Sequence, residues 1–290
     1  MTRAFPFSPA TGALIDLALN EDLFAGDVTS DAVFAADEQV VGWLVAKQEL
    51  VVAGRDLVDE VYRRVDRRID IEWFVEDGQR VGRGAIARTA GPCRSLLRAE
   101  RVALNFLRHL SGVATITRRC VDALGTDGPA LLDTRKTTPG FRELEKYAVR
   151  CGGGRNHRFN LGSGAMIKDN HIAAAGSIGA AVSRVRATLP WLMQVEVEVS
   201  SVDQLEAAIE AGADVVLLDN MSTDEMRRAC AQAAGRVLLE ASGNITFERL
   251  AELRGVGLDA VSSGAITHSA PNVDISYLLQ ADAPKAPTLP

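Results

Sequence analysis

The chain has 290 residues, a formal net charge of −6 at pH 7, and 47% hydrophobic and 24% charged residues. Such a composition is typical of a globular protein that buries a sizeable core in one large or two medium domains. Its acidity argues against general nucleic-acid binding, and its apolar runs are too short to cross a membrane. Four cysteines without a CxxC pair, and a first segment without the apolar core of a signal peptide, predict a reducing, cytoplasmic setting.

The first part of the chain mixes helical and strand patterns. Apolar spacing predicts helices over 14–23, 56–65, 96–110 and 113–124, and strands over 40–46, 50–53, 69–73 and 84–90. Residues 69–73 alternate apolar and polar side chains, which is typical of an antiparallel strand with one face in water. We therefore expect an α+β domain here.

The later part of the chain has a different pattern. Short apolar strands are predicted at 130–133, 165–168, 195–199, 215–219, 237–241 and 260–263. Amphipathic helices are predicted between the later strands, over 202–211, 223–234 and 247–253. This alternation indicates a parallel sheet built from βα units. Because no GxGxxG follows the first strand and polar residues end many strands, a (β/α) barrel is favoured over a Rossmann sheet. From Ser276 the chain is expected to form a short helix and then loose chain.

Positive charge is concentrated between Arg135 and Lys168. This acidic protein carries eight cations there, against only Glu143 and Glu145; the cations lie at positions 135, 136, 142, 146, 150, 155, 158 and 168. Glycine runs at 152–154 and 162–164 allow the backbone to approach a ligand closely. We expect a small polyanion to bind here, the alternative being a basic surface loop.

Polar residues also end the predicted barrel strands. They are Arg135, Lys136, Lys168, Glu198, Asp219, Ser242-Gly243-Asn244 and Ser263-Gly264-Ala265. In a barrel all of them point into one cavity. The two glycine-containing loops are expected to bind phosphate through backbone N–H groups. Glu198 and Asp219, which face many cations, predict a magnesium ion held largely through water.

At this point the sequence resembles the quinolinate phosphoribosyltransferase family. The matching stretches cover nearly the whole chain in the family's order: 21–22, 26–29, 100–105, 133–140, 156–158, 166–171, 196–198, 218–220, 242–244 and 263–265. The resemblance implies an open α+β sandwich at 1–112, joined by the tail 275–290, and an incomplete α/β barrel at 113–274. It also implies transfer of phosphoribosyl from phosphoribosyl pyrophosphate to quinolinate, which gives nicotinate mononucleotide, CO2 and pyrophosphate in NAD synthesis.

The resemblance further implies roles for single residues. Lys136, Lys168, Glu198 and Asp219 would be catalytic, with the two acids holding Mg2+. Quinolinate would be bound by Arg135, Lys136, His157, Arg158 and Lys168, and His157 either donates to it or orients Arg158. The loops 242–244 and 263–265 would bind phosphate. Arg101 would come from the partner subunit, so a homodimer with shared sites is expected, and larger assemblies stay open.

Three other functions are weighed against this one. One is a molybdate-transport-associated branch of the same fold. Another is a barrel aldolase that forms a Schiff base on Lys168, whose weakness is the surplus of fixed cations. The third is a non-catalytic anion-binding module, and the presence of the acids Glu198 and Asp219 argues against it.

Overall fold

The computed structural model describes Phe5 and residues 7–280, and it divides into two compact units. Of the described residues, the first unit takes in those up to 118 together with 138–153 and 269–280, and the second takes in 119–137 and 154–268. The predicted boundary between residues 112 and 113 falls inside helix α4 (Cys93–Leu124). The fold class predicted from the sequence, an α+β domain followed by a parallel α/β domain, is confirmed.

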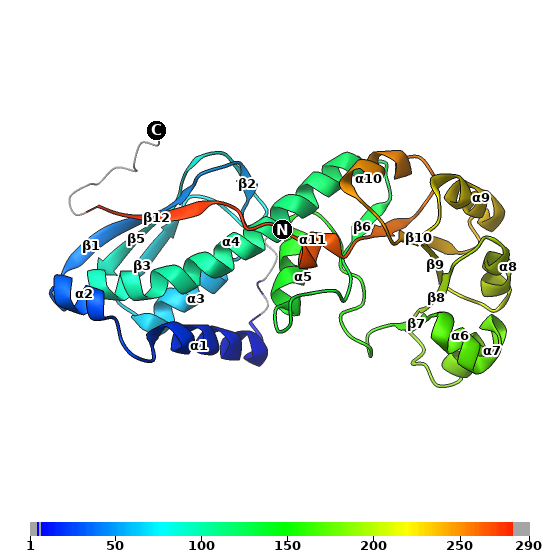
Figure 1. The fold of residues 1–290 in the computed structure, drawn as a ribbon, viewed down its shortest axis with the longest axis horizontal. Coiled ribbons are helices and arrows are strands. Elements are labelled where there is room, and N and C mark those ends of the chain that lie inside the picture. The colour runs from blue at the N-terminus through cyan, green and yellow to red at the C-terminus, as the bar shows by residue number, and fades with distance from the viewer. Residues whose placement is uncertain (1–4, 6, 281–290) are drawn as a thin grey trace. The chain divides into compact units, whose positions relative to one another are not determined.

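The first unit is built on an antiparallel sheet with the strand order β12-β1-β5-β3 (Figure 1). These strands are β1 (Gln39–Ala46), β3 (Asp70–Trp73), β5 (Gly84–Pro92) and β12 (Ile275–Gln280). Strands β2 (Leu50–Val51) and β4 (Arg80–Val81) form a separate antiparallel pair. The helix predicted from Ser276 is wrong, because this segment pairs with β1 as a strand; residues 281–290 lie outside the described residues.

Helices complete the first unit. They are α1 (Pro9–Leu23), α2 (Val28–Val33), α3 (Arg55–Val65), α4 and α5 (Arg142–Cys151). Apolar residues at helical spacing on α3 are buried, and Trp73 Nε1 of β3 donates to Asp59 Oδ1 of α3 at 2.7 Å. The two helices predicted over 96–110 and 113–124 are one continuous helix, α4.

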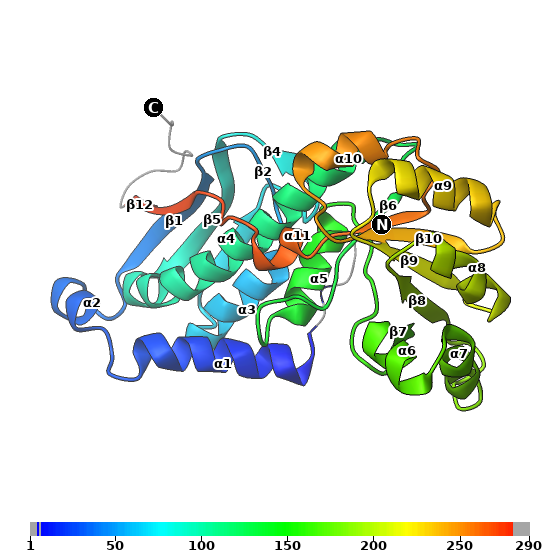
Figure 2. The same cartoon turned by 45° about the vertical axis from the view of Figure 1, so that its right-hand side comes forward.

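The second unit is built on a parallel sheet with the strand order β6-β11-β10-β9-β8-β7. Its strands are β6 (Ala130–Leu132), β7 (Ala165–Ile167), β8 (Val195–Val199), β9 (Val215–Asp219), β10 (Leu238–Ser242) and β11 (Ala260–Ser262). The helices are α6 (Asp169–Ala175), α7 (Ile178–Arg186), α8 (Asp203–Glu210), α9 (Thr223–Ala233), α10 (Phe247–Leu253) and α11 (Ala265–His268). Figure 2 shows α7, α8, α9 and α10 outside the curved sheet. Since β6 and β7 are its two edges, the described sheet is an incomplete barrel.

The sequence of β8 explains how this sheet is buried. Val195, Val197 and Val199 are almost fully buried, whereas Glu196 and Glu198 point to the opposite face. Ser222 and Thr246 cap α9 and α10 by accepting backbone N–H bonds at the third helical position. Among the described residues no helix has the length and apolarity needed to cross a membrane.

Candidate active site

The carboxyl ends of the parallel strands gather polar side chains on one face of the sheet. Glu198 of β8 is paired with Leu217 of β9, and Asp219 of β9 is paired with Ser242 of β10. Side chains alternate along a strand, so Asp219, two residues after Leu217, shares the face of Glu198. Lys168 follows β7 in the same register. The sheet thus brings the predicted lysine, both acids and the first phosphate-loop serine to one edge.

Neighbouring strand ends also contact one another directly. Lys168 Nζ forms an ion pair with Glu198 Oε2. Asn220 Nδ2 donates to Asp219 Oδ2 at 2.8 Å, and Asn244 Nδ2 donates to Asn220 Oδ1 at 2.9 Å. These bonds connect the acid that ends β9 to the loop after β10, so the predicted metal ligands and one predicted phosphate loop form a continuous polar edge.

Both predicted phosphate loops contain a glycine at a point of close approach. Gly243 has φ +81°, and a Cβ on it would lie 2.3 Å from Asn220 Oδ1. A Cβ on Gly264 would lie 3.0 Å from Cδ of Lys136. Thr267 Oγ1 donates to the carbonyl of Lys136 at 2.8 Å, which connects the loops after β6 and β11. Glycine is therefore favoured at 243 by both conformation and space, whereas a side chain at 264 would require only a small shift of Lys136 and His268.

Two asparagines at strand ends have left-handed backbone conformations. Asn220 has φ 55° and Asn244 has φ 49°. Asparagine adopts this conformation more readily than most residues, but it is still a strained one. Backbone strain of this kind clusters at ligand-binding sites, where the surrounding contacts hold it in place. Here the bond between the two side chains supplies such a contact.

The segment after α5 brings His157 and Arg158 to this sheet. Arg155 forms a parallel bridge with Leu132 of β6, which extends the sheet at its edge. The fully buried carboxylate of Asp133 accepts the backbone N–H of His157 at 2.9 Å and Asn156 Nδ2 at 2.6 Å. Asp133, a residue of the matching motif without a predicted role, thus fixes the path of the 156–158 segment.

The guanidinium of Arg158 is held in a crowded cationic position. It donates to Gly164 O at 2.9 Å and contacts Met166 Sδ at 3.6 Å. Burial lowers the pKa of Arg158, the nearby charge of Arg135 lowers it further, and Glu196 acts in the opposite direction. Two guanidinium groups that repel each other gain stability when an anion binds between them. This concentration of positive charge favours an anionic ligand.

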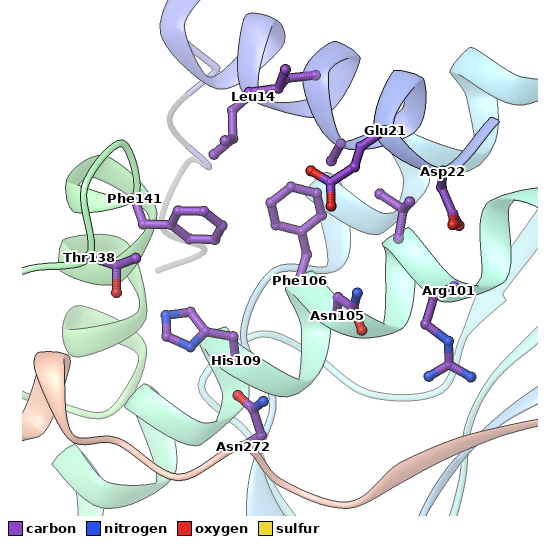
Figure 3. A pocket seen from close by; sticks show the side chains of 13 residues that line it. Leu14, Glu21, Asp22, Arg101, Asn105, Phe106, His109, Thr138, Phe141 and Asn272 are labelled. Atoms are coloured by element: carbon purple, nitrogen blue, oxygen red, sulfur yellow. The ribbon is translucent and has the colours of Figure 1, made fainter. Parts of the chain in front are cut away.

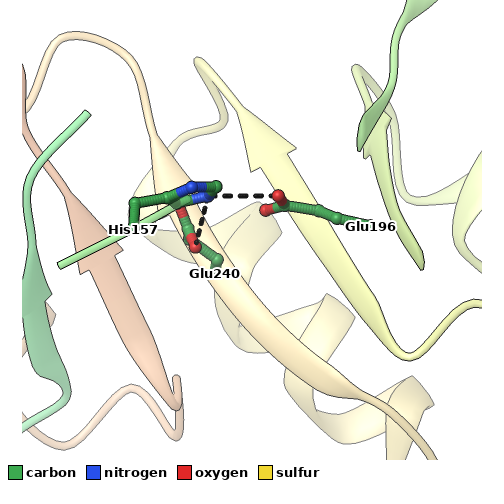
Figure 4. A group of neighbouring side chains, drawn as sticks. All are labelled: His157, Glu196 and Glu240. Carbon is green, nitrogen blue, oxygen red and sulfur yellow. Dashed lines mark ion pairs between the residues drawn. The ribbon is translucent and has the colours of Figure 1, made fainter. Parts of the chain in front are cut away.

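Sequence reasoning missed two acids, Glu196 and Glu240. Both are buried, and their oxygens lie 3.1 Å and 3.7 Å from His157 Nε2 (Figure 4). The three residues line a cavity of about 920 Å3 together with residues at the amino ends of the strands. Burial, and then the neighbouring Glu196, raises the pKa of Glu240 to about 7. The Val-Glu-Val-Glu-Val alternation of β8 is the signal that places Glu196 on the same face as Glu198.

The eight cations between Arg135 and Lys168 are divided between the two units. Arg142, Lys146 and Arg150 lie on α5 of the first unit, whereas the other five belong to the second unit. Lys146 is buried, and Arg150 lies over the ring of Tyr147. Helix 142–151 was not predicted from the sequence, and it separates three of the eight cations from the others. Only the five cations of the second unit share a unit with the strand-end acids.

Arg101 lies on α4 in the first unit. Its side chain is 56% exposed and lies 3.7 Å from Glu100, a distance typical of a weak surface pair. It lines a pocket of about 360 Å3 with Glu21 and Asp22 of α1 and Phe106 of α4 (Figure 3). The side chain thus stands at the rim of a pocket within its own unit, with its charge available to a further ligand.

The chain is similar to known proteins along most of its length. The family model "Quinolinate phosphoribosyl transferase, N-terminal domain" matches residues 27–111, and its C-terminal counterpart matches residues 113–278. The chain is 43% identical to the "Probable nicotinate-nucleotide pyrophosphorylase [carboxylating]" of Bacillus subtilis, over 88% of this chain and 89% of that one. It is also 43% identical to the Mycobacterium leprae protein named "Nicotinate-nucleotide pyrophosphorylase [carboxylating]", over 89% and 93%. The crystal structure of NadC from Streptococcus pyogenes matches with a TM-score of 0.92 and 43% identity, over 96% and 99%.

Proposed function

The chain belongs to the quinolinate phosphoribosyltransferase family, and we propose that it transfers phosphoribosyl from phosphoribosyl pyrophosphate to quinolinate in NAD synthesis. The ring nitrogen of quinolinate bonds to C1′ of the ribose as the bond from C1′ to pyrophosphate breaks. The nitrogen becomes cationic, so it stabilises the electron pair left on the adjacent carbon when its carboxylate departs as CO2. A proton takes the carboxylate's place, which gives nicotinate mononucleotide.

The cations of the second unit support binding of the acceptor. Quinolinate has two adjacent carboxylates, and planar guanidinium groups match carboxylates with paired hydrogen bonds. We assign this task to Arg135 and Arg158, whose mutual repulsion a dianion relieves. Lys136 and Lys168 supply further positive charge. In a homodimer the partner subunit's Arg101 completes the site. The exposure of the Arg101 side chain and its weak pairing with Glu100 support this role.

The carboxyl edge of the sheet supports binding of the donor. Glu198 and Asp219 share one face and offer only oxygen ligands, which fits magnesium. When bound, magnesium neutralises the charge that builds on the departing pyrophosphate. Glu198 and Asp219 also attract the positive charge that develops on the sugar, and the loops 242–244 and 263–265 offer backbone N–H groups to phosphate.

One observation carries the proposal: the Lys168–Glu198 pair, Asp219 and both glycine loops meet at one edge of the sheet. It also weakens the aldolase alternative, because an imine-forming lysine needs an apolar or cationic surrounding rather than a carboxylate partner. The free thiols of the four cysteines support a reducing, cytoplasmic location.

The test is to incubate the protein with quinolinate, phosphoribosyl pyrophosphate and MgCl2 and to measure nicotinate mononucleotide by chromatography. Product is expected, and EDTA should abolish it until Mg2+ or Mn2+ is restored in excess. Full activity in EDTA would contradict the metal assignment, and absence of product in Mg2+ would contradict the function.

A further inference from the structure

A histidine and two glutamates meet inside the second unit (Figure 4). His157 Nε2 lies 3.1 Å from Glu196 Oε2 and 3.7 Å from Glu240 Oε2. Glu196 is 7% exposed and Glu240 3%, and among the described residues the Oε1 atom of each has no hydrogen-bond partner. Buried carboxylates this poorly satisfied are costly, so they indicate a task other than stability.

The second nitrogen of His157 identifies its tautomer. The backbone N–H of Arg158 donates to Nδ1 at 2.7 Å, and a nitrogen that accepts this bond carries no proton. The ring proton is therefore on Nε2, where it points at Glu196. A metal ion on Nε2 would move that proton to Nδ1, where it would face the Arg158 N–H, so the geometry disfavours a metal site.

We propose that Glu196 and Glu240 are positioning residues for the acceptor acid: they hold His157 in this tautomer, and His157 in turn orients Arg158. The inference rests on the proposed function and adds two residues to it. The Arg158 peptide is fixed by Nδ1 of His157, and its guanidinium is fixed by Gly164 O at 2.9 Å. Glu196 also offsets the repulsion that Arg158 experiences from Arg135. Arg158 is thus held ready for a carboxylate before that carboxylate arrives.

Steady-state kinetics test whether the two glutamates position the quinolinate-binding residues or only stabilise the fold. Glu196→Gln should raise the KM for quinolinate about tenfold, as expected for loss of one charge-assisted bond. Glu240→Gln should raise it by a smaller factor, because its oxygen lies 3.7 Å from His157 Nε2, beyond hydrogen-bond distance. The KM for phosphoribosyl pyrophosphate should stay within a factor of about two, which would distinguish this effect from general damage. Glu210→Gln, at an exposed position on α8, is the matched control and should change neither constant.

Substitution of His157 tests whether its Nδ1 atom orients Arg158. His157→Asn keeps an acceptor near the position of Nδ1, whereas His157→Leu removes it. The Asn variant should keep a KM for quinolinate well below that of the Leu variant. Equal losses in both variants, or glutamine variants that leave the KM for quinolinate unchanged, would overturn the inference.

The tautomer is measured without substrate, by 15N NMR of histidine-labelled protein. The chain has four histidines, and the signal of His157 is the one that His157→Asn removes. A ring protonated on Nε2 alone is expected. A proton on Nδ1, or a signal that shifts on addition of Zn2+, would overturn the inference even if the enzyme is active. Wild-type protein without turnover of quinolinate would instead overturn the proposed function and its acceptor site.

Discussion

Buried Glu240, a proposed positioning residue, makes the stability of the protein depend on pH. Its pKa is raised from 4.5 to about 7, chiefly by burial and then by Glu196. The folded state therefore holds this proton more tightly than the unfolded state. Stability from this group is present below pH 4.5 and is lost as the pH rises through about 7.

Glu240→Gln should remove this loss. The variant should gain about 2 kcal/mol of stability over wild type at pH 8 and much less at pH 5. Urea denaturation at the two pH values measures the difference, with Glu210→Gln as the exposed control. A gain that is the same at both pH values would show that Glu240 does not titrate as described.

Gly243 tests the predicted phosphate loop after β10. Gly243→Ala should displace Asn220, because its Cβ would lie 2.3 Å from Oδ1, and should raise the KM for phosphoribosyl pyrophosphate more than that for quinolinate. Gly212→Ala is a matched control: φ is +84° there, but no atom lies within 4 Å of the added Cβ. If both variants behave alike, backbone strain and not the lost space explains the effect.

The sequence predicted the positions of several candidate site residues, because strand-end residues follow from the βα pattern. Lys168, Glu198 and Asp219 lie where that pattern puts them. Glu196 and Glu240 were missed because they lie one layer deeper in the sheet. Only the register of neighbouring strands shows that both reach His157, and a single sequence does not contain that register.

At the scale of elements, α4 shows why a glycine is not always a helix end. The sequence predicts a break near Gly112, but α4 runs without interruption from Cys93 to Leu124. A Cβ on Gly112 would lie 2.1 Å from the carbonyl oxygen of Pro271. This glycine lets a distant segment approach the helix, a contact that local pattern cannot reveal.

Gly112→Ala should therefore destabilise the protein by about 1–3 kcal/mol, although alanine is the better helix former. Gly179→Ala in α7, where no atom lies within 4 Å of the added Cβ, should be neutral or stabilising. Denaturation midpoints in urea compare the two. A stabilised Gly112→Ala would mean that helix propensity outweighs the contact with Pro271.

One element was not predicted from the sequence, and another was predicted wrongly. Helix α5 was not predicted, and its residues 144–149 and Cys151 are buried. The segment after Ser276 was predicted as helix but completes a sheet whose other strands lie more than 180 residues earlier. Partners so distant decide these elements, and local spacing does not identify them.

At the scale of the whole molecule, the proposed shared site makes Arg101 essential to a partner. Arg101→Ala and Lys168→Ala should each be nearly inactive, because in the proposed shared site both cations are paired with a substrate anion away from water, and loss of such a partner costs about 2–5 kcal/mol. When both are co-expressed, a mixed dimer has one site without either side chain and one intact site. Mixing should therefore restore part of the activity.

The control for this experiment is to isolate the mixed dimer with two different affinity tags. If it is present but inactive, Arg101 acts within its own chain or on the surface, and the shared site is refuted.

In the proposed reaction, quinolinate loses the carboxylate beside its ring nitrogen. Quinolinate labelled with 13C at that carboxylate allows 13CO2 and pyrophosphate to be measured together. We expect equal amounts of the two products, and little or no turnover of nicotinate, which lacks that carboxylate. Pyrophosphate released without labelled CO2, or comparable turnover of nicotinate, would refute the proposed reaction.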